Sequence, residues 1–189
     1  MKKIILSVLL TLSLSLSFAQ DLNSLKTEAN KAYTAGSTMN YDAIFETTYP
    51  KVFDIVSKEM MKMSFEQMMN NEDFSIKLVP VAPNFSFGEI RTIGKQKFCM
   101  VDHDTKMVMT FKQELDNAEM MVDIFKSSMQ AEEVTYNKDE KSFHIKVRST
   151  LIGVSDELTK NQWKFVNKDK NNQLSHMLFS EEVINELGM

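Results

Sequence analysis

The triplet Asp102-His103-Asp104 carries the side chains in this sequence that are best suited to acid–base chemistry. A carboxylate next to an imidazole can share its proton, but the acid and the base must converge on one substrate to act together. Adjacent residues on a strand point to opposite faces, and the triplet adjoins Asp104-Thr105, the polar tip of a predicted hairpin. We therefore expect these side chains to face water, and we assign no catalytic residue.

His176 is the best single candidate for an acid–base or hydrogen-bonding group. If its segment is a strand, His176 shares a face with Leu174 and Leu178, and that face lines a cavity where the sheet curls around one. The alternative is a hydrogen-bonded core histidine or an exposed histidine on a sheet edge.

His144 stands with Lys146 and Arg148 on the polar side of another predicted strand. Three groups that can carry positive charge on one face could bind an anion. The alternative interpretation is an ordinary solvated face, where charged side chains are usually found.

The 15 methionines are the residues that could bind a soft metal ion such as Cu(I). Many recur in short groups: Met60, Met61 and Met63; Met68 and Met69; Met107 and Met109; Met120 and Met121. These positions face the core on predicted helices and strands, and methionine fills irregular gaps in cores and pliable pockets. No histidine lies near a group in the sequence, so we predict no metal site and no cofactor. Cys99, within the apolar run 98–101, is expected to be a buried small hydrophobe.

Residues 1–19 are typical of an export signal, with Lys2 and Lys3 before an apolar stretch and Ser17-Phe18-Ala19 as the cleavage site. A membrane anchor is the alternative, but the apolar stretch is shorter than the roughly 20 residues that a spanning helix needs. We expect residues 20–189 to form a single exported domain, periplasmic or extracellular, without a transmembrane segment. The net charge of −4 argues against a nucleic-acid partner.

Helical spacing of apolar residues predicts a helix over residues 21–35 that stops at Gly36, and a second helical stretch from Asn40. Pro50 should break that stretch at Tyr49-Pro50, and the pattern resumes from Val52 to about residue 69. A further helix is predicted over residues 115–130, and a short final helix follows Ser180.

Alternation of apolar and polar residues predicts strands over 73–79, 86–93, 97–103, 106–112 and 134–137, and a run of strands over 142–179. Phe143, Ile145 and Val147 form one apolar face, which the helices within residues 20–70 are expected to cover. The fold class is therefore α+β, with N-terminal helices on a strongly curved antiparallel sheet, one further helix between two strand groups, and a short C-terminal helix.

This order of elements resembles the nuclear transport factor two-like superfamily, the cone-shaped α+β fold shared with ketosteroid isomerase and scytalone dehydratase. The chain departs from that pattern by an extra strand or two before the central helix. The segments Tyr49-Pro50-Lys51-Val52-Phe53 and Trp163-Lys164-Phe165, with the signal ending Phe18-Ala19-Gln20, are similar to a group of secreted flavobacterial proteins. The superfold includes enzymes, carriers and adaptors, so the resemblance implies a fold and not a function.

An apolar, methionine-rich sheet face without a catalytic set favours a non-enzymatic protein that binds an apolar small molecule or peptide in the cone of the sheet. The expected pocket walls are Tyr49, Phe53, Met109, Trp163 and His176. One alternative is a lyase or isomerase that uses His176 with a carboxylate brought close by folding. The other is a protein-interaction module with a filled core.

Overall fold

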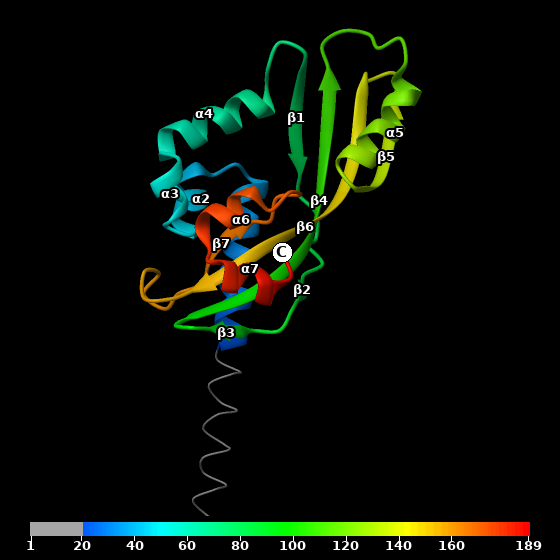
Figure 1. Ribbon diagram of the computed structural model, residues 1–189. Coiled ribbons are helices and arrows are strands. Elements are labelled where there is room, and N and C mark those ends of the chain that lie inside the picture. Colours follow the sequence, from blue (N-terminus) through cyan, green and yellow to red (C-terminus); the bar gives the residue numbers. More distant parts are fainter. Residues whose placement is uncertain (1–20) are drawn as a thin grey trace, which may run out of the picture.

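The computed structural model describes residues 21–189, and its first part is a series of helices (Figure 1). A helix over residues 21–37 is followed by α2 (Tyr41–Thr47), α3 (Val52–Ile55) and α4 (Lys58–Met69). The side-chain oxygens of Asn40 and Ser57 accept hydrogen bonds from the backbone N–H groups of Ala43 and Met60, and these bonds cap the starts of α2 and α4.

The helix ends agree with the prediction from the sequence at Pro50 and differ from it elsewhere. The expected break at Tyr49-Pro50 is confirmed, because residues 48–51 are not helical. The predicted stop at Gly36 is wrong, since the helix continues to residue 37 and Met39 takes the left-handed conformation after it. The stretch after Val52 is also not continuous, because Ser57 starts a separate helix.

Seven strands form one antiparallel sheet in the order β1-β4-β6-β5, with β2 and β3 also paired with β4 and β7 paired with β6. Their bounds are β1 (Phe74–Val79), β2 (Ser86–Phe87), β3 (Arg91–Ile93), β4 (Gln96–Phe111), β5 (Ala131–Asn137), β6 (Ser142–Ser155) and β7 (Lys164–Asn167). Helix α5 (Ala118–Ser128) lies between β4 and β5 in the chain. The N-terminal helices and α5 lie toward opposite sides of Figure 1.

β4 is one 16-residue strand, so the hairpin expected at Asp104-Thr105 does not exist. β4 pairs with β6 without interruption from Lys97↔Ser155 to Thr110↔Ser142. The strand expected over 86–93 is in fact two short strands, β2 and β3, which are separated by residues 88–90.

The sheet narrows to two strands at its centre. On the outer side of β4, β1 ends opposite Lys106 and β2 begins opposite Asp102. On the outer side of β6, β5 begins opposite Val147 and β7 ends opposite Leu151. We call residues 103–105 of β4 and 148–150 of β6 the waist.

Prolines explain why, among residues 21–189, no full strand pairs with the outer side of β4 at the waist. Pro80 and Pro83 lie between β1 and β2, and neither has an N–H group to donate to a strand ladder. Irregular segments provide single bonds instead: the Asp104 N–H donates to the Pro83 carbonyl (2.7 Å), and the Lys168 N–H donates to the Thr150 carbonyl (2.9 Å).

Above the waist, α5 covers the sheet face of Phe143, Ile145 and Val147, which are all buried. The expectation that these residues are buried is confirmed. The expectation that residues 20–70 cover them is wrong, because the cluster around them is built from β1, β4, β5 and α5.

Below the waist, both faces of the sheet are covered. The helix over 21–37 packs Leu25 and Ala29 against Cys99, Val101 and neighbouring residues of one face. A Cβ at Gly153 would lie 3.3 Å from Cδ1 of Leu25, so this glycine permits the close approach of helix and sheet. The other face packs against α3 and the two last helices.

Those last helices are α6 (Gln173–Leu178) and α7 (Glu181–Leu187). The segment expected as a strand over 174–179 is therefore a helix, which starts after Asn172 in the left-handed conformation. The predicted final helix is confirmed, with Ser180 as its N-cap and Gly188 at its end with φ +68°.

The fold class is α+β, as predicted: N-terminal helices on an antiparallel sheet, α5 between two strand groups, and a short C-terminal helix. Within residues 21–189, no helix has both the length and the apolar character needed to cross a membrane. The expected export signal, residues 1–19, lies outside the described residues.

Candidate ligand-binding cavity

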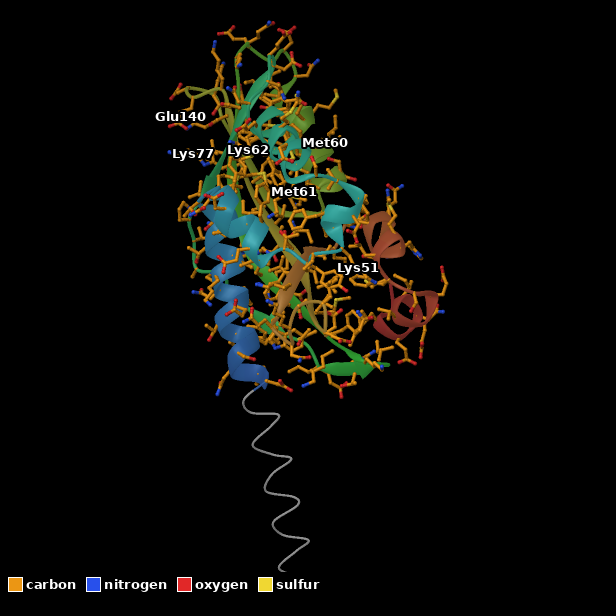
Figure 2. The ribbon with its side chains drawn as sticks, turned by 90° about the vertical axis from the view of Figure 1, so that its left-hand side faces the viewer. Lys51, Met60, Met61, Lys62, Lys77 and Glu140 are labelled. Carbon is orange, nitrogen blue, oxygen red and sulfur yellow. The ribbon has the colours of Figure 1, made fainter. Side chains whose placement is uncertain are left out.

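A partly enclosed cavity of about 510 Å³ lies over the waist. Its lining comes from the helix over 21–37, α2, α4, the end of β1, and the central parts of β4, β6 and β7. Figure 2 shows the N-terminal helix rising toward α2 and α4, with Met60, Met61 and Lys62 labelled on α4. The volume lies within the range of roughly 300–1,000 Å³ that is typical of small-molecule pockets.

Methionines form much of the apolar wall. Five of them line the cavity: Met39, Met61, Met68, Met69 and Met107. Phe65 of α4 and Leu151 and Phe165 of the sheet add further apolar surface. An unbranched thioether adapts its shape at little cost, so such a wall can accommodate ligands of varied outline.

The expectation that all grouped methionines face the core is wrong for four of them. Met60, Met63, Met68 and Met120 are each more than half exposed. Met68 is exposed and also lines the cavity. No residue of α4 is fully buried. Helix α4 therefore covers the cavity without being deeply packed into the fold.

The helix over residues 21–37 contributes Ala32, Tyr33 and Gly36 to the lining. The Tyr33 hydroxyl donates to the Val81 carbonyl (2.9 Å), which ties this helix to the segment between β1 and β2. A Cβ built at Gly36 meets no atom within 4 Å, so the glycine leaves open space at its position.

The waist gives the cavity its polar floor, which consists of His103, Thr105 and Ser149. His103 and Ser149 are cross-strand partners, and Thr105 follows His103 on the same face of β4. Nδ1 of His103 lies 3.3 Å from Oγ1 of Thr105 and 3.5 Å from the Asp104 carbonyl oxygen. A carbonyl only accepts hydrogen bonds, so a hydrogen on Nδ1 satisfies both contacts, and Thr105 then accepts from His103.

This arrangement leaves hydrogen-bonding capacity unused. His103 is only 7% exposed, and its Nε2 atom has no hydrogen-bond partner among the described residues. Burial lowers the pKa of His103, so the imidazole is held in its neutral form. With Oγ1 of Thr105 accepting from Nδ1, the threonine O–H can donate elsewhere.

The opposite face of the waist carries a buried carboxylate, Asp104. Its oxygens accept hydrogen bonds from Nδ2 of Asn84 (2.8 Å) and Nη1 of Arg148 (2.7 Å), and Nζ of Lys146 lies 3.6 Å away. The bonds from Asn84 and Arg148 lower the pKa of Asp104 to about 2, so the group is ionised at neutral pH.

The structure thus separates the members of the Asp102-His103-Asp104 triplet. Asp102 accepts a hydrogen bond from Oγ1 of Thr150 (2.7 Å), Asp104 is bound to Arg148, and His103 faces the cavity. The expectation that acid and base do not converge agrees with this geometry. The expectation that all three face water is wrong, because His103 and Asp104 are buried in the middle of a long strand.

The three residues predicted as a possible anion-binding face, His144, Lys146 and Arg148, each lie close to a carboxylate of the same chain. Lys146 and Arg148 pair with Asp104, Lys146 also pairs with Glu132 (2.6 Å), and His144 lies 3.5 Å from Glu140. These partners explain this face as part of the fold, and we place no anion site there.

The five residues expected to form pocket walls do not come together around this cavity. Tyr49 is fully buried below the waist, where its hydroxyl donates to the Asp156 carboxylate (2.8 Å). Trp163 belongs to the cluster under the helix over 21–37, and Met109 belongs to the cluster under α5. The Phe53 ring contacts the Phe45 ring edge-on.

His176 lies outside the cavity as well. It is on α6, with its side chain 46% exposed and Nδ1 3.8 Å from Oε1 of Glu181, which is itself 83% exposed. Folding does bring a carboxylate close to His176, but both side chains are exposed and neither lines the cavity.

A second, shallower groove of about 680 Å³ adjoins the cavity. It lies between the C-terminal end of α4, residues 37–41 and β1. Ser37, Met39, Met69 and Leu78 line both spaces, so the groove and the cavity share a boundary.

In comparisons with known proteins, no family model, curated protein or solved structure matches this chain. The likeness to the nuclear transport factor two-like superfamily and to secreted flavobacterial proteins therefore stays a prediction.

Proposed function

We propose that this protein binds an apolar small molecule, without transforming it, in the cavity above the waist. The observation that carries the proposal is a cavity of about 510 Å³ with mainly apolar walls and a small polar floor. Pockets for small molecules have this composition, with a few polar groups that fix the orientation of the ligand.

The arrangement of titratable groups favours binding over catalysis. Asp102 and Asp104 are bound to Thr150 and Arg148, so neither carboxylate reaches His103 to form an acid–base pair. His176 and Glu181 lie in solvent outside the cavity. We further propose that the protein is exported and works in the periplasm or outside the cell, as the sequence of residues 1–19 indicates.

Native mass spectrometry of the purified protein tests this proposal. We expect a population heavier than the polypeptide by the mass of a small apolar molecule, and we expect organic extraction to remove the additional mass. The extracted protein should then bind the neutral fluorophore N-phenyl-1-naphthylamine with one-to-one stoichiometry. A protein that carries no additional mass and does not bind the fluorophore would contradict the proposal.

A further inference from the structure

We infer that the ligand of this cavity is a long-chain carboxylate, whose acid group lies at the polar floor and whose chain lies along the methionine wall. This inference rests on the proposed function and names the chemical class of the ligand. Three features of the cavity support it: the charge of its lining, the hydrogen-bond donors of the floor, and the position of both relative to the apolar wall.

The charge of the lining is opposite in sign to that of the chain. The chain has 26 acidic and 22 basic residues. Among the described residues that line the cavity, none is aspartate or glutamate; two are lysines, Lys168 and also Lys106, which shares the strand face of Asp104. The nearby carboxylate of Asp104 faces the other side of the sheet and is neutralised by Arg148 and Lys146. An amine would find no counter-charge among the described residues that line this cavity, whereas a carboxylate would meet no other carboxylate there.

The floor can donate hydrogen bonds to an acid group. The Thr105 hydroxyl accepts from Nδ1 of His103, so its own hydrogen is available to the cavity. Within residues 21–189, no hydrogen bond is formed by the Ser149 hydroxyl, which belongs to the same face of the waist. Two hydroxyl donors on neighbouring strands match the two oxygens of a carboxylate, and bonds to a charged acceptor are stronger than bonds to a neutral one.

The donors come from the sheet, and a large part of the apolar wall comes from α4. His103, Thr105 and Ser149 come from the sheet, whereas Met61, Phe65, Met68 and Met69 come from α4. A molecule with one acidic end and one long apolar part satisfies both sides, because its chain removes apolar surface from water and its head group meets the donors.

Three probes with the same chain test the inference: dodecanoate, methyl dodecanoate and dodecylamine, each measured by displacement of N-phenyl-1-naphthylamine. We expect dodecanoate to bind at least about tenfold more tightly than the other two. If all three displace the fluorophore equally, the inference is wrong and the proposed function still holds. If the fluorophore itself does not bind, the proposed function fails and the inference fails with it.

Variants of the floor give the second readout. Thr105→Val and Ser149→Ala each remove one hydroxyl at nearly constant volume, and we expect each to weaken dodecanoate binding about tenfold. The affinity for the neutral fluorophore should fall much less than the affinity for dodecanoate, a difference that an unfolded variant would not show. Thr105→Ser keeps a hydroxyl at this position and should therefore keep the affinity for dodecanoate. Unchanged dodecanoate affinity in Thr105→Val and Ser149→Ala would overturn the inference.

Discussion

Asp104 and Arg148 form a 2.7 Å ion pair across the two strands of the waist, on the face opposite the polar floor. The Asp104 side chain is 8% exposed, whereas Arg148 is 31% exposed. The pair therefore links β4 to β6 at the waist, where, among the described residues, no other full strand flanks them. It lies on the face of the sheet opposite the polar floor of the cavity.

Replacing Asp104 by Asn should lower the free energy of unfolding by about 2 kcal/mol, because Arg148 loses its carboxylate partner and its hydrogen bond to residue 104 is no longer made to an anion. Urea unfolding measures this loss. Glu132→Gln is the matched control, because Glu132 pairs with the same Lys146 at 2.6 Å but is 43% exposed, so its loss should be much smaller.

The same group predicts an acid dependence of stability. The pKa of Asp104 is lowered to about 2 from an ordinary value of 3.8, so its contribution is complete above about pH 4 and is lost as the pH falls toward 2. The difference in unfolding free energy between the wild type and Asp104→Asn should shrink over this interval. A difference that stays constant between pH 5 and pH 2 would show that Asp104 is not held in its ionised form by the fold.

His103 should make stability depend on pH in a higher range. Burial lowers its pKa below the ordinary value of 6.5, so the unfolded chain takes up a proton before the folded one does. Stability is therefore greatest above about pH 6.5 and falls as the pH drops below it. His103→Gln removes this titration, so urea unfolding between pH 7.5 and pH 5 should show a shallower decline for the variant. An equal decline in both proteins would contradict the burial of His103.

Gly36 offers a test of the cavity that does not disturb the core. It is helical and lines the cavity, and a Cβ there meets no atom within 4 Å. Gly36→Ala should stabilise the helix by about 0.5–1 kcal/mol and leave ligand binding intact. Gly36→Trp should place a large ring in the open space and reduce fluorophore binding. If Gly36→Trp binds the fluorophore as tightly as the wild type does, the open space at residue 36 is not part of the ligand site.

Helix α4 should be the most labile cover of the cavity. It has no fully buried residue, whereas β4 and β6 are paired along almost their whole lengths. Hydrogen exchange should therefore be faster in α4 than in β4, and a bound ligand should slow exchange in α4. Equal protection of α4 and β4 without ligand would contradict this prediction.

The sequence was sufficient for the fold class and for most helix starts, because caps and apolar periodicity are local signals. Asn40, Ser180 and Pro50 illustrate this, since each acts on residues only a few positions away. The prediction of a hairpin at Asp104-Thr105 was wrong, because the hydrogen-bond partners of Asp104 are distant in the sequence. Asn84 and Arg148 lie 20 and 44 residues away, so a buried ion pair looked like a polar turn.

The site residues were predicted least well, for a related reason. Leu174 and Leu178 share a face in a strand and also in a helix, so their spacing did not decide the structure around His176. Tyr49 and Trp163 were predicted as pocket walls, but both side chains are buried in the core. The cavity is lined by methionines and by small residues such as Gly36, and the abundance of methionine was the one signal in the sequence that pointed to it.

Methionine methyl NMR tests the central claim most directly, because it reports on the cavity and on the rest of the protein together. With ¹³C-methyl labelling, added dodecanoate should shift the signals of the five methionines that line the cavity: Met39, Met61, Met68, Met69 and Met107. Met109, Met120 and Met177 lie outside it and should not move. Shifts confined to those outer methionines, or no shifts at saturating dodecanoate, would contradict a ligand site above the waist.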